Sequence, residues 1–293
     1  MASFTNQATL SYSGGTTTSN IVTGEVVATF SAAKTAVTEQ YAPGDTVTYV
    51  VSILNTSDSP LTALTVSDDL GGYEFQDGTL YPLTYVEGSM LFYLDGVLQA
   101  QPAVTAGPPM EVTGISIPTG SNAMLIYETQ VTEFAPLGTD ASVTNTAVIS
   151  GEGMSCQLEA VSTVPAGNEA RLTVSKSLCP DEIPCNGELT YSFLIQNSGG
   201  SEAEAADQVS LSDTFDPILT GLTVTYNGAV QTEPGFYTYD ETTGLFTTAP
   251  GQITVPAAEF TQNEDGAWNT DPGAVTLTVT GQLGAPQEER TRP

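Results

Sequence analysis

The sequence predicts an all-β protein in which one additional strand precedes two β-sandwich domains in series. Short alternating runs rich in Thr, Val, Ser and Tyr are separated by Gly, Pro, Asn-Gly and Asp-Gly turn signals, a pattern typical of sandwiches. Helical periodicity is almost absent. The same pattern of landmarks occurs twice along 293 residues, a length that allows two domains with separate cores.

The two domains are predicted from an internal repeat. Its landmarks recur after 142 residues, with Lys34, Tyr49 and Asn55 matched by Lys176, Tyr191 and Asn197. Residues 64–68 (LTVSD) then match residues 209–213 (VSLSD) at an offset of 145, so a short insertion separates the two landmarks. Repetition at a fixed period indicates a tandem duplication of one structural unit.

The additional strand is predicted from a second match. Residues 2–11 (ASFTNQATLS) and residues 141–150 (ASVTNTAVIS) are identical at six of ten positions. The later copy closes the first repeat, whereas the earlier copy opens the chain. Asn6 precedes Lys34 by 28 residues and Asn145 precedes Lys176 by 31, so both copies hold the same place relative to the repeat that follows.

These matches divide the chain into segments. The expected order is an N-terminal donor strand (1–14), a linker (15–26), domain 1 (27–151), a second linker (152–169), domain 2 without its final strand (170–285) and a polar tail (286–293). The final strand is expected to be missing because residues 281–286 correspond to residues 134–138, the loop before the closing strand of domain 1.

A sandwich that lacks a strand exposes unpaired backbone groups beside an apolar groove, and such an edge invites strand addition. The orphan strand has the right sequence to fill it, through Phe4, Asn6, Ala8 and Leu10. Insertion into domain 2 of a neighbouring copy would be a heterologous contact and would generate an open filament. Insertion in cis would give a closed monomer, and a disordered tail is the third alternative.

The landmarks resemble a known family. Lys34, the run PGDTVTY at residues 43–49, Val-Ser-Asp at 66–68 and the closing TNTA at 144–147 resemble the immunoglobulin-like (Ig-like) conserved repeat domain of bacterial surface proteins, a domain of unknown function. Domain 2 departs from the pattern at its turn, where Cys-Asn-Gly stands at 185–187. The resemblance implies an extracellular structural protein, such as a pilus-like fibre, a spore appendage or a sheath, and carries no enzymatic activity.

A covalent lock follows from the same resemblance. In Gram-positive surface Ig-like domains, a buried Lys can join an Asn of the last strand as an isopeptide, assisted by an acidic residue. By analogy, Lys34 would join Asn145 beside Asp68. The equivalent Lys176 and Asp213 would act on Asn6 of a neighbouring subunit. The alternative is a buried Lys–Asp pair with the Asn capping a turn.

Composition excludes several classes of function. With 5 Lys and Arg against 34 Asp and Glu, the surface repels nucleic acid and anionic membranes, so neither is an expected partner. The donor strand instead makes other copies of the same chain the expected partners. The sequence holds no apolar run of about 18 residues, which predicts no membrane span, and no signal peptide is visible. His, GxSxG and a Gly-rich phosphate loop are missing, so no enzyme is predicted.

No cofactor is expected either, although oxygen-rich residues 263–271 leave Ca²⁺ as an alternative that does not match EF-hand spacing. Cys179 and Cys185 flank a turn-like segment and are candidates for a local disulfide, with Cys156 left over. A monomeric surface adhesin that binds through aromatic runs 80–85 and 235–239 is the alternative function. Both functions place the protein outside the cell, on a bacterial or spore surface.

Overall fold

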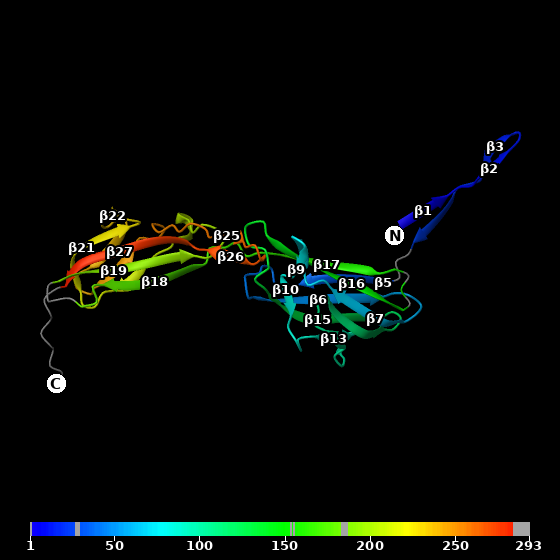
Figure 1. Cartoon of the computed structure of the whole chain (residues 1–293), viewed down its shortest axis with the longest axis horizontal. Helices are drawn as coiled ribbons and strands as arrows, with labels where there is room; N and C mark the ends of the chain where they lie inside the picture. The colour runs from blue at the N-terminus through cyan, green and yellow to red at the C-terminus, as the bar shows by residue number, and fades with distance from the viewer. Residues whose placement is uncertain (1, 27–29, 153, 155, 183–186, 284–293) are drawn as a thin grey trace. The chain divides into compact units, whose positions relative to one another are not determined.

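The computed structural model describes residues 2–26, 30–152, 154, 156–182 and 187–283. The chain divides into two compact units, one of residues 1–135 with 143–164 and the other of residues 136–142 with 165–293 (Figure 1). The regular elements are β-strands apart from one turn of 3-10 helix, η1 (Ala205–Asp207). The predicted all-β class is therefore confirmed.

The N-terminal segment forms a hairpin with two rungs of pairing (Figure 1, dark blue). Its strands are β1 (Ala2–Asn6), β2 (Thr9–Tyr12), β3 (Gly15–Thr18) and β4 (Val22–Val26). Strand β1 pairs with β4 and β2 pairs with β3, both antiparallel. The prediction of a linker over residues 15–26 is wrong, because these residues return along the first arm and pair with it.

Domain 1, the part of the first unit that follows this hairpin, packs two antiparallel sheets. One sheet has the order β12-β11-β15-β6-β5, with β10 also paired to β15, and the other has the order β13-β14-β7-β16-β17. The strands of the first sheet are β5 (Phe30–Ala36), β6 (Thr46–Asn55), β10 (Leu83–Tyr85), β11 (Leu91–Leu94), β12 (Val97–Leu98) and β15 (Asn122–Val131). Those of the second are β7 (Leu61–Asp68), β13 (Ala103–Thr105), β14 (Met110–Ile117), β16 (Ser142–Glu152) and β17 (Leu158–Pro165). A small hairpin joins β8 (Tyr73–Phe75) to β9 (Gly78–Leu80).

The core of domain 1 follows from the two-residue alternation of its strands. In β6, Val47, Tyr49, Val51 and Ile53 are buried while the residues between them face outward, and β16 buries Val143, Asn145, Ala147 and Ile149 in the same way. Strand β17 belongs to this sandwich, although the sequence places it in a linker at 152–169. Only Ala160 and Val164 are buried in this strand, while the apolar Val161 is exposed, so its sequence shows no clear two-residue alternation.

Domain 2 forms one sheet of five strands and a second of three. The first has the order β18-β19-β27-β21-β22 and the second the order β20-β24-β23. The strands are β18 (Leu172–Cys179), β19 (Glu188–Asn197), β20 (Ser212–Thr214), β21 (Leu219–Tyr226), β22 (Ala229–Gln231), β23 (Tyr237–Asp240), β24 (Leu245–Thr248) and β27 (Gly273–Leu283). Strands β25 (Glu259–Gln262) and β26 (Trp268–Asp271) form a separate hairpin.

The repeat predicted from the sequence is visible in the pairing. Phe30 faces Asn55 across β5 and β6, and Leu172 faces Asn197 across β18 and β19, so the register repeats at the 142-residue offset. Burial does not repeat. Strand β5 buries Phe30 and Lys34, whereas every residue of β18 is exposed. In the described part of domain 2, nothing covers the face of β18 that its counterpart uses in domain 1.

Candidate functional site

Lys34, Asp68 and Asn145 come from three different strands, and the core of domain 1 encloses all three. Lys34 lies on β5, Asp68 ends β7 and Asn145 lies on β16, which pairs with β7 so that Ala147 faces Asp68. Lys34 Nζ donates to Asp68 Oδ2 at 2.6 Å, and both side chains are fully buried. The ammonium also lies over the ring of Tyr49, 4.7 Å from its centroid.

Asp68 is the centre of the polar cluster. Its Oδ2 accepts hydrogen bonds from Lys34 Nζ and from the Tyr127 hydroxyl, and its Oδ1 accepts one from the backbone N–H of Leu70 at 3.0 Å. Tyr127 stacks on Tyr49 with ring centroids 5.9 Å apart. Charge-assisted hydrogen bonds of this kind are strong, so the carboxyl group is held in one orientation.

Burial lowers the pKa of Lys34, against the opposing effect of Asp68. The apolar surroundings therefore favour the neutral amine more than water does. A neutral amine is a nucleophile, whereas an ammonium is not. The core of domain 1 thus holds a Lys whose charged form is disfavoured by burial, with its Nζ 2.6 Å from Asp68 Oδ2.

Asn145 has an unusual environment for a buried amide. It is fully buried, yet neither its Nδ2 nor its Oδ1 has a hydrogen-bond partner among the described residues. Burial raises the pKa of Tyr49, and the nearby Asn145 side chain lowers it in part, although the two groups do not reach hydrogen-bond geometry. An unsatisfied buried amide costs about 1–3 kcal/mol for each lost partner and calls for an explanation.

The equivalent groups of domain 2 are open to solvent. Lys176 Nζ donates to Asp213 Oδ2, but the side chains are 40% and 21% exposed, compared with 0% for both partners in domain 1. Lys176 Nζ lies 4.3 Å from the Tyr191 ring centroid, as its counterpart lies over Tyr49. Across from Tyr191 stands Val279, so the hydroxyl that Tyr127 supplies in domain 1 has no counterpart at this position.

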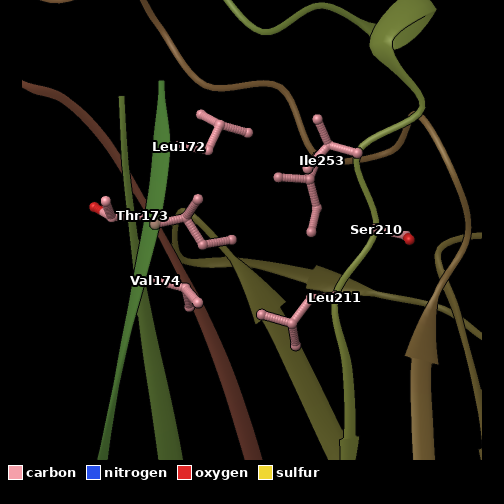
Figure 2. Close-up of a pocket in the computed structure, with 8 residues that line it drawn as sticks. Leu172, Thr173, Val174, Ser210, Leu211 and Ile253 are labelled. Atoms are coloured by element: carbon pink, nitrogen blue, oxygen red, sulfur yellow. The ribbon is translucent and has the colours of Figure 1, made fainter. Parts of the chain in front are cut away.

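A groove leads along domain 2 to this Lys–Asp pair. One stretch is lined by Leu172, Val174, Leu211 and Ile253, whose side chains point toward one another while Thr173 and Ser210 point away (Figure 2). The next stretch is lined by Val174, Lys176, Phe193, Leu211 and Asp213. We call these two stretches the domain 2 groove. It runs between β18 and β20, where β16 would lie if domain 2 repeated domain 1.

The N-terminal strand carries the side chains that fill this place in domain 1. Phe4, Asn6, Ala8 and Leu10 are all exposed, with Phe4 at 57% and Leu10 at 64%. Their sequence equivalents are the four buried residues of β16, namely Val143, Asn145, Ala147 and Ile149. Phe4, Ala8 and Leu10 thus leave apolar surface uncovered on a short hairpin, which is typical of an interaction surface.

The cysteines and the oxygen-rich residues 263–271 do not form a site among the described residues. Cys156 and Cys179 are exposed, and Cys185 lies outside the described residues together with the pairing predicted for it. Residues 263–267 form the turn between β25 and β26, with Asn263 Oδ1 accepting from Asn269 Nδ2 at 2.7 Å. Within the described ranges, no three His, Cys, Asp or Glu side chains are grouped to hold a metal ion. Nor does any helix there have the length and apolar character to cross a membrane.

The aromatic runs of the adhesin alternative contribute largely to the cores. Leu83 and Tyr85 are buried in domain 1, and Phe236 and Tyr237 are buried in domain 2. Side chains that stabilise a core are not available to a ligand without unfolding.

Two parts of the site were missed by sequence reasoning. Tyr127 lies within the run MLIYETQV, where alternation marks it as buried but does not reveal that its hydroxyl binds Asp68. The return arm β3–β4 is rich in Thr, Ser and Gly, which resembles a linker. The one sequence feature that could have revealed this arm is its position: residues 15–26 follow residues 2–11 as β17 follows β16.

Domain 1 is expected to lose stability above about pH 10, the ordinary pKa of Tyr. Burial raises the pKa of Tyr41, Tyr49 and Tyr127, so the folded state keeps three protons that the unfolded chain releases. Together they lower the free energy of unfolding by about 4 kcal/mol per pH unit. The lowered pKa of Lys34 acts in the opposite direction, but only up to the ordinary lysine value of about 10.4.

Urea titrations between about pH 9 and pH 11.5 measure this slope. Tyr127→Phe should reduce it by about a third, because one of the three phenols is removed. An unchanged slope in that variant would show that Tyr127 does not keep its proton in the folded state.

Comparison with known proteins gives similarity of fold at low identity. No family model and no curated protein matches the chain. The major pilin BcpA of Bacillus cereus is 15% identical with a TM-score of 0.34, and the match covers 92% of this chain and 73% of BcpA. The pilus backbone protein RrgB of Streptococcus pneumoniae is 12% identical with a TM-score of 0.35, covering 84% of this chain and 55% of RrgB.

ACE19, the collagen-binding subdomain of the Enterococcus faecalis surface protein ACE, is 12% identical with a TM-score of 0.31. This match covers 48% of the chain and 99% of ACE19. At these scores and identities the similarity concerns the fold alone. The class that the fold defines is an all-β protein with two β-sandwich domains in tandem.

Proposed function

We propose that this protein is the structural subunit of an extracellular bacterial filament, which polymerises when the N-terminal strand of one subunit enters domain 2 of its neighbour. One observation carries the proposal. The domain 2 groove lies where domain 1 holds β16, and residues 2–11 repeat the sequence of β16. One chain therefore carries both a groove that can accept a strand and a strand with the sequence to fill it.

Each inserted residue has a place that domain 1 defines. Ala8 takes the place of Ala147, which faces Asp68 and is fully buried, so it would face Asp213. Leu10 takes the place of Ile149, which faces Val66, and would lie beside Leu211. Asn6 takes the place of Asn145 and would approach Lys176. Burying Leu10 alone is worth about 1.5–3 kcal/mol, and main-chain pairing to β20 adds to it.

The charge distribution supports insertion between two acidic chains. The net charge of the whole chain is −29, whereas residues 2–26 contain one charged side chain, Glu25. Two subunits repel each other over most of their surfaces, but the donor segment can enter the groove with little repulsion. Because the donor and groove are different surfaces, each contact leaves one of each free, which generates an open polymer.

The proposal includes a covalent step in domain 1. Lys34 Nζ, as the neutral amine, attacks Cγ of Asn145, and a C–N bond forms while the original amide nitrogen leaves as ammonia. The Asp68 carboxyl takes the proton from the attacking nitrogen and delivers it to the leaving nitrogen. The unpartnered Asn145 amide beside the buried Lys34–Asp68 pair supports this step, because conversion to an isopeptide removes the unsatisfied Nδ2 as ammonia and leaves only the carbonyl oxygen.

The same chemistry would close the joint between subunits. Strand insertion covers Lys176 and Asp213, removes them from water and brings Asn6 of the neighbour to the lysine. Desolvation then favours the neutral amine, as in domain 1. Since Val279 replaces Tyr127, Asp213 lacks one donor, so we expect this bond to form more slowly than the bond within domain 1.

Assembly is tested with matched substitutions on the two faces of the donor strand. Ala8→Asp should abolish filaments, because Ala8 takes a buried place beside Asp213, and deletion of residues 2–12 should do the same. Thr5→Asp should assemble normally, because its equivalent Thr144 is exposed in domain 1. Sedimentation and negative-stain microscopy of purified chains measure the outcome.

Filaments that persist in the deletion variant would disprove the donor role of this segment. A wild-type chain that stays monomeric at high concentration with a protected Phe4 would instead indicate closure in cis and the monomeric surface module. The filament proposal places the protein on the outside of a bacterial cell or spore, with copies of itself as partners.

A further inference from the structure

The sheets of domain 2 can be compared with those of domain 1 strand by strand. Its five-stranded sheet matches the sheet β12-β11-β15-β6-β5 of domain 1 strand for strand along that path. The other sheet has β20, β24 and β23 where domain 1 has β7, β14 and β13, followed by β16 and β17. In the described part of domain 2, both β16 and β17 have no counterpart.

The N-terminal hairpin repeats the pairing of that missing pair. In the hairpin, Thr5 faces Thr23 and Ala2 faces Val26. In domain 1, Thr144 Oγ1 lies 3.0 Å from Thr163 Oγ1, and Ala166 N donates to Ala141 O at 2.8 Å. Strand β1 therefore corresponds to β16 at an offset of 139 residues, and β4 corresponds to β17 at an offset of 140. The turn that joins the two arms is one residue longer in domain 1.

Cross-strand packing is complementary between the two hairpins. Val143 and Val164 are both buried in domain 1, and their equivalents are Phe4 and Gly24. Phe4 faces Gly24, and a Cβ placed on Gly24 would come within 2.5 Å of the Phe4 ring. A larger residue on one arm is thus matched by a smaller one on the other, so the two arms form one packing unit.

Strand β17, the equivalent of the return arm β3–β4, covers one side of domain 1. Strand β17 closes the side of the sandwich next to β5, where Ala36 N donates to Ser162 Oγ at 3.0 Å. Within the described residues of domain 2 no strand covers β18 in this way, and Val174 and Leu178 on β18 are 59% and 41% exposed. On the hairpin, Ile21 and Val22 are exposed as well, and Val22 is the equivalent of Ser162.

We propose that the subunit donates the whole hairpin of residues 2–26, with β1–β2 entering the groove and the return arm β3–β4 covering β18 of the neighbour. This inference rests on the proposed function and extends it. A single inserted strand leaves β18 and the outer edge of β1–β2 exposed. A donated hairpin restores the five-stranded order of domain 1 and buries Val22 against Leu178.

The inference is tested with cysteine pairs divided between two chains, so that a disulfide can form only between subunits. In a background with Cys156, Cys179 and Cys185 replaced by Ser, chains with Val22→Cys and chains with Leu178→Cys are co-expressed and mildly oxidised. We expect a disulfide between them, because their equivalents Ser162 and Ala36 are in contact. Thr23→Cys with Leu178→Cys is the matched control, since adjacent strand residues face opposite sides.

A third pair separates this inference from the filament proposal. Thr9→Cys with Ser212→Cys reports the first arm, because their equivalents Val148 and Ser67 face each other in domain 1. Cross-linking of this pair without the Val22–Leu178 pair would establish single-strand donation and overturn the inference, while the filament proposal stands. Failure of both pairs would overturn both. Peptide mass spectrometry of the oxidised polymers identifies each disulfide.

Discussion

Polymers of an Asn6→Ala chain are expected to fall apart into single subunits in boiling detergent, whereas wild-type polymers remain as a ladder. The substitution removes the amide that Lys176 would attack but leaves Phe4, Ala8 and Leu10 to fill the groove. Assembly in native buffer should therefore continue while the covalent joint is lost. Lys176→Ala should give the same result from the other side of the joint.

Thr5→Ala is the matched control, because Thr5 is next to Asn6 and its equivalent Thr144 faces solvent. It should leave the ladder intact. In wild-type digests, the peptide that joins residues 6 and 176 should be lighter than the sum of its parts by one ammonia. Wild-type polymers that dissolve in boiling detergent would show that the joint is held by strand pairing alone.

Lys34→Met is expected to produce the largest loss of stability in the molecule. Before the Lys34–Asn145 bond forms, the substitution leaves the buried Asp68 without its cation, a change that costs about 3–5 kcal/mol. In the bonded chain Lys34 is a neutral amide, and the substitution instead removes a cross-link that closes a loop of 111 residues (145 minus 34), worth about 4–5 kcal/mol by analogy with disulfides. Either loss is a large part of the roughly 5–15 kcal/mol by which small domains are stable, so domain 1 should be strongly destabilised.

The matched control is Lys176→Met in unassembled subunits. Its ion pair is partly exposed, so the loss should stay below about 1 kcal/mol. Urea unfolding followed by domain-specific hydrogen exchange measures both variants, and intact mass of the wild-type chain should fall short of its sequence mass by one ammonia. Equal effects of the two variants would contradict the difference in burial and the lock in domain 1.

The sequence carries enough information to predict the duplication and the central polar cluster. Lys34, Tyr49 and Asp68 sit on strongly alternating strands, so their burial follows from period two and their proximity from the repeat. The alternation of residues 2–11 likewise matches the buried face of β16.

The return arms were not predictable in the same way. Strand β17 and the arm β3–β4 lie at the edge of a sandwich, where few side chains are buried and Thr, Ser and Gly are tolerated. Their composition is therefore that of a linker. The Tyr127–Asp68 hydrogen bond depends on how two sheets face each other, which no local pattern encodes.

The open groove of domain 2 also determines how a filament would stop growing. If the hairpin and the groove are the two halves of each joint, the ends of a fibre differ chemically, and one always presents a groove while the other presents a hairpin. A chain that carries Ala8→Asp keeps a working groove and a defective hairpin, so it would bind at one end and block further addition there. Mixed into wild-type protein, it should act as a chain terminator whose mole fraction sets the mean fibre length.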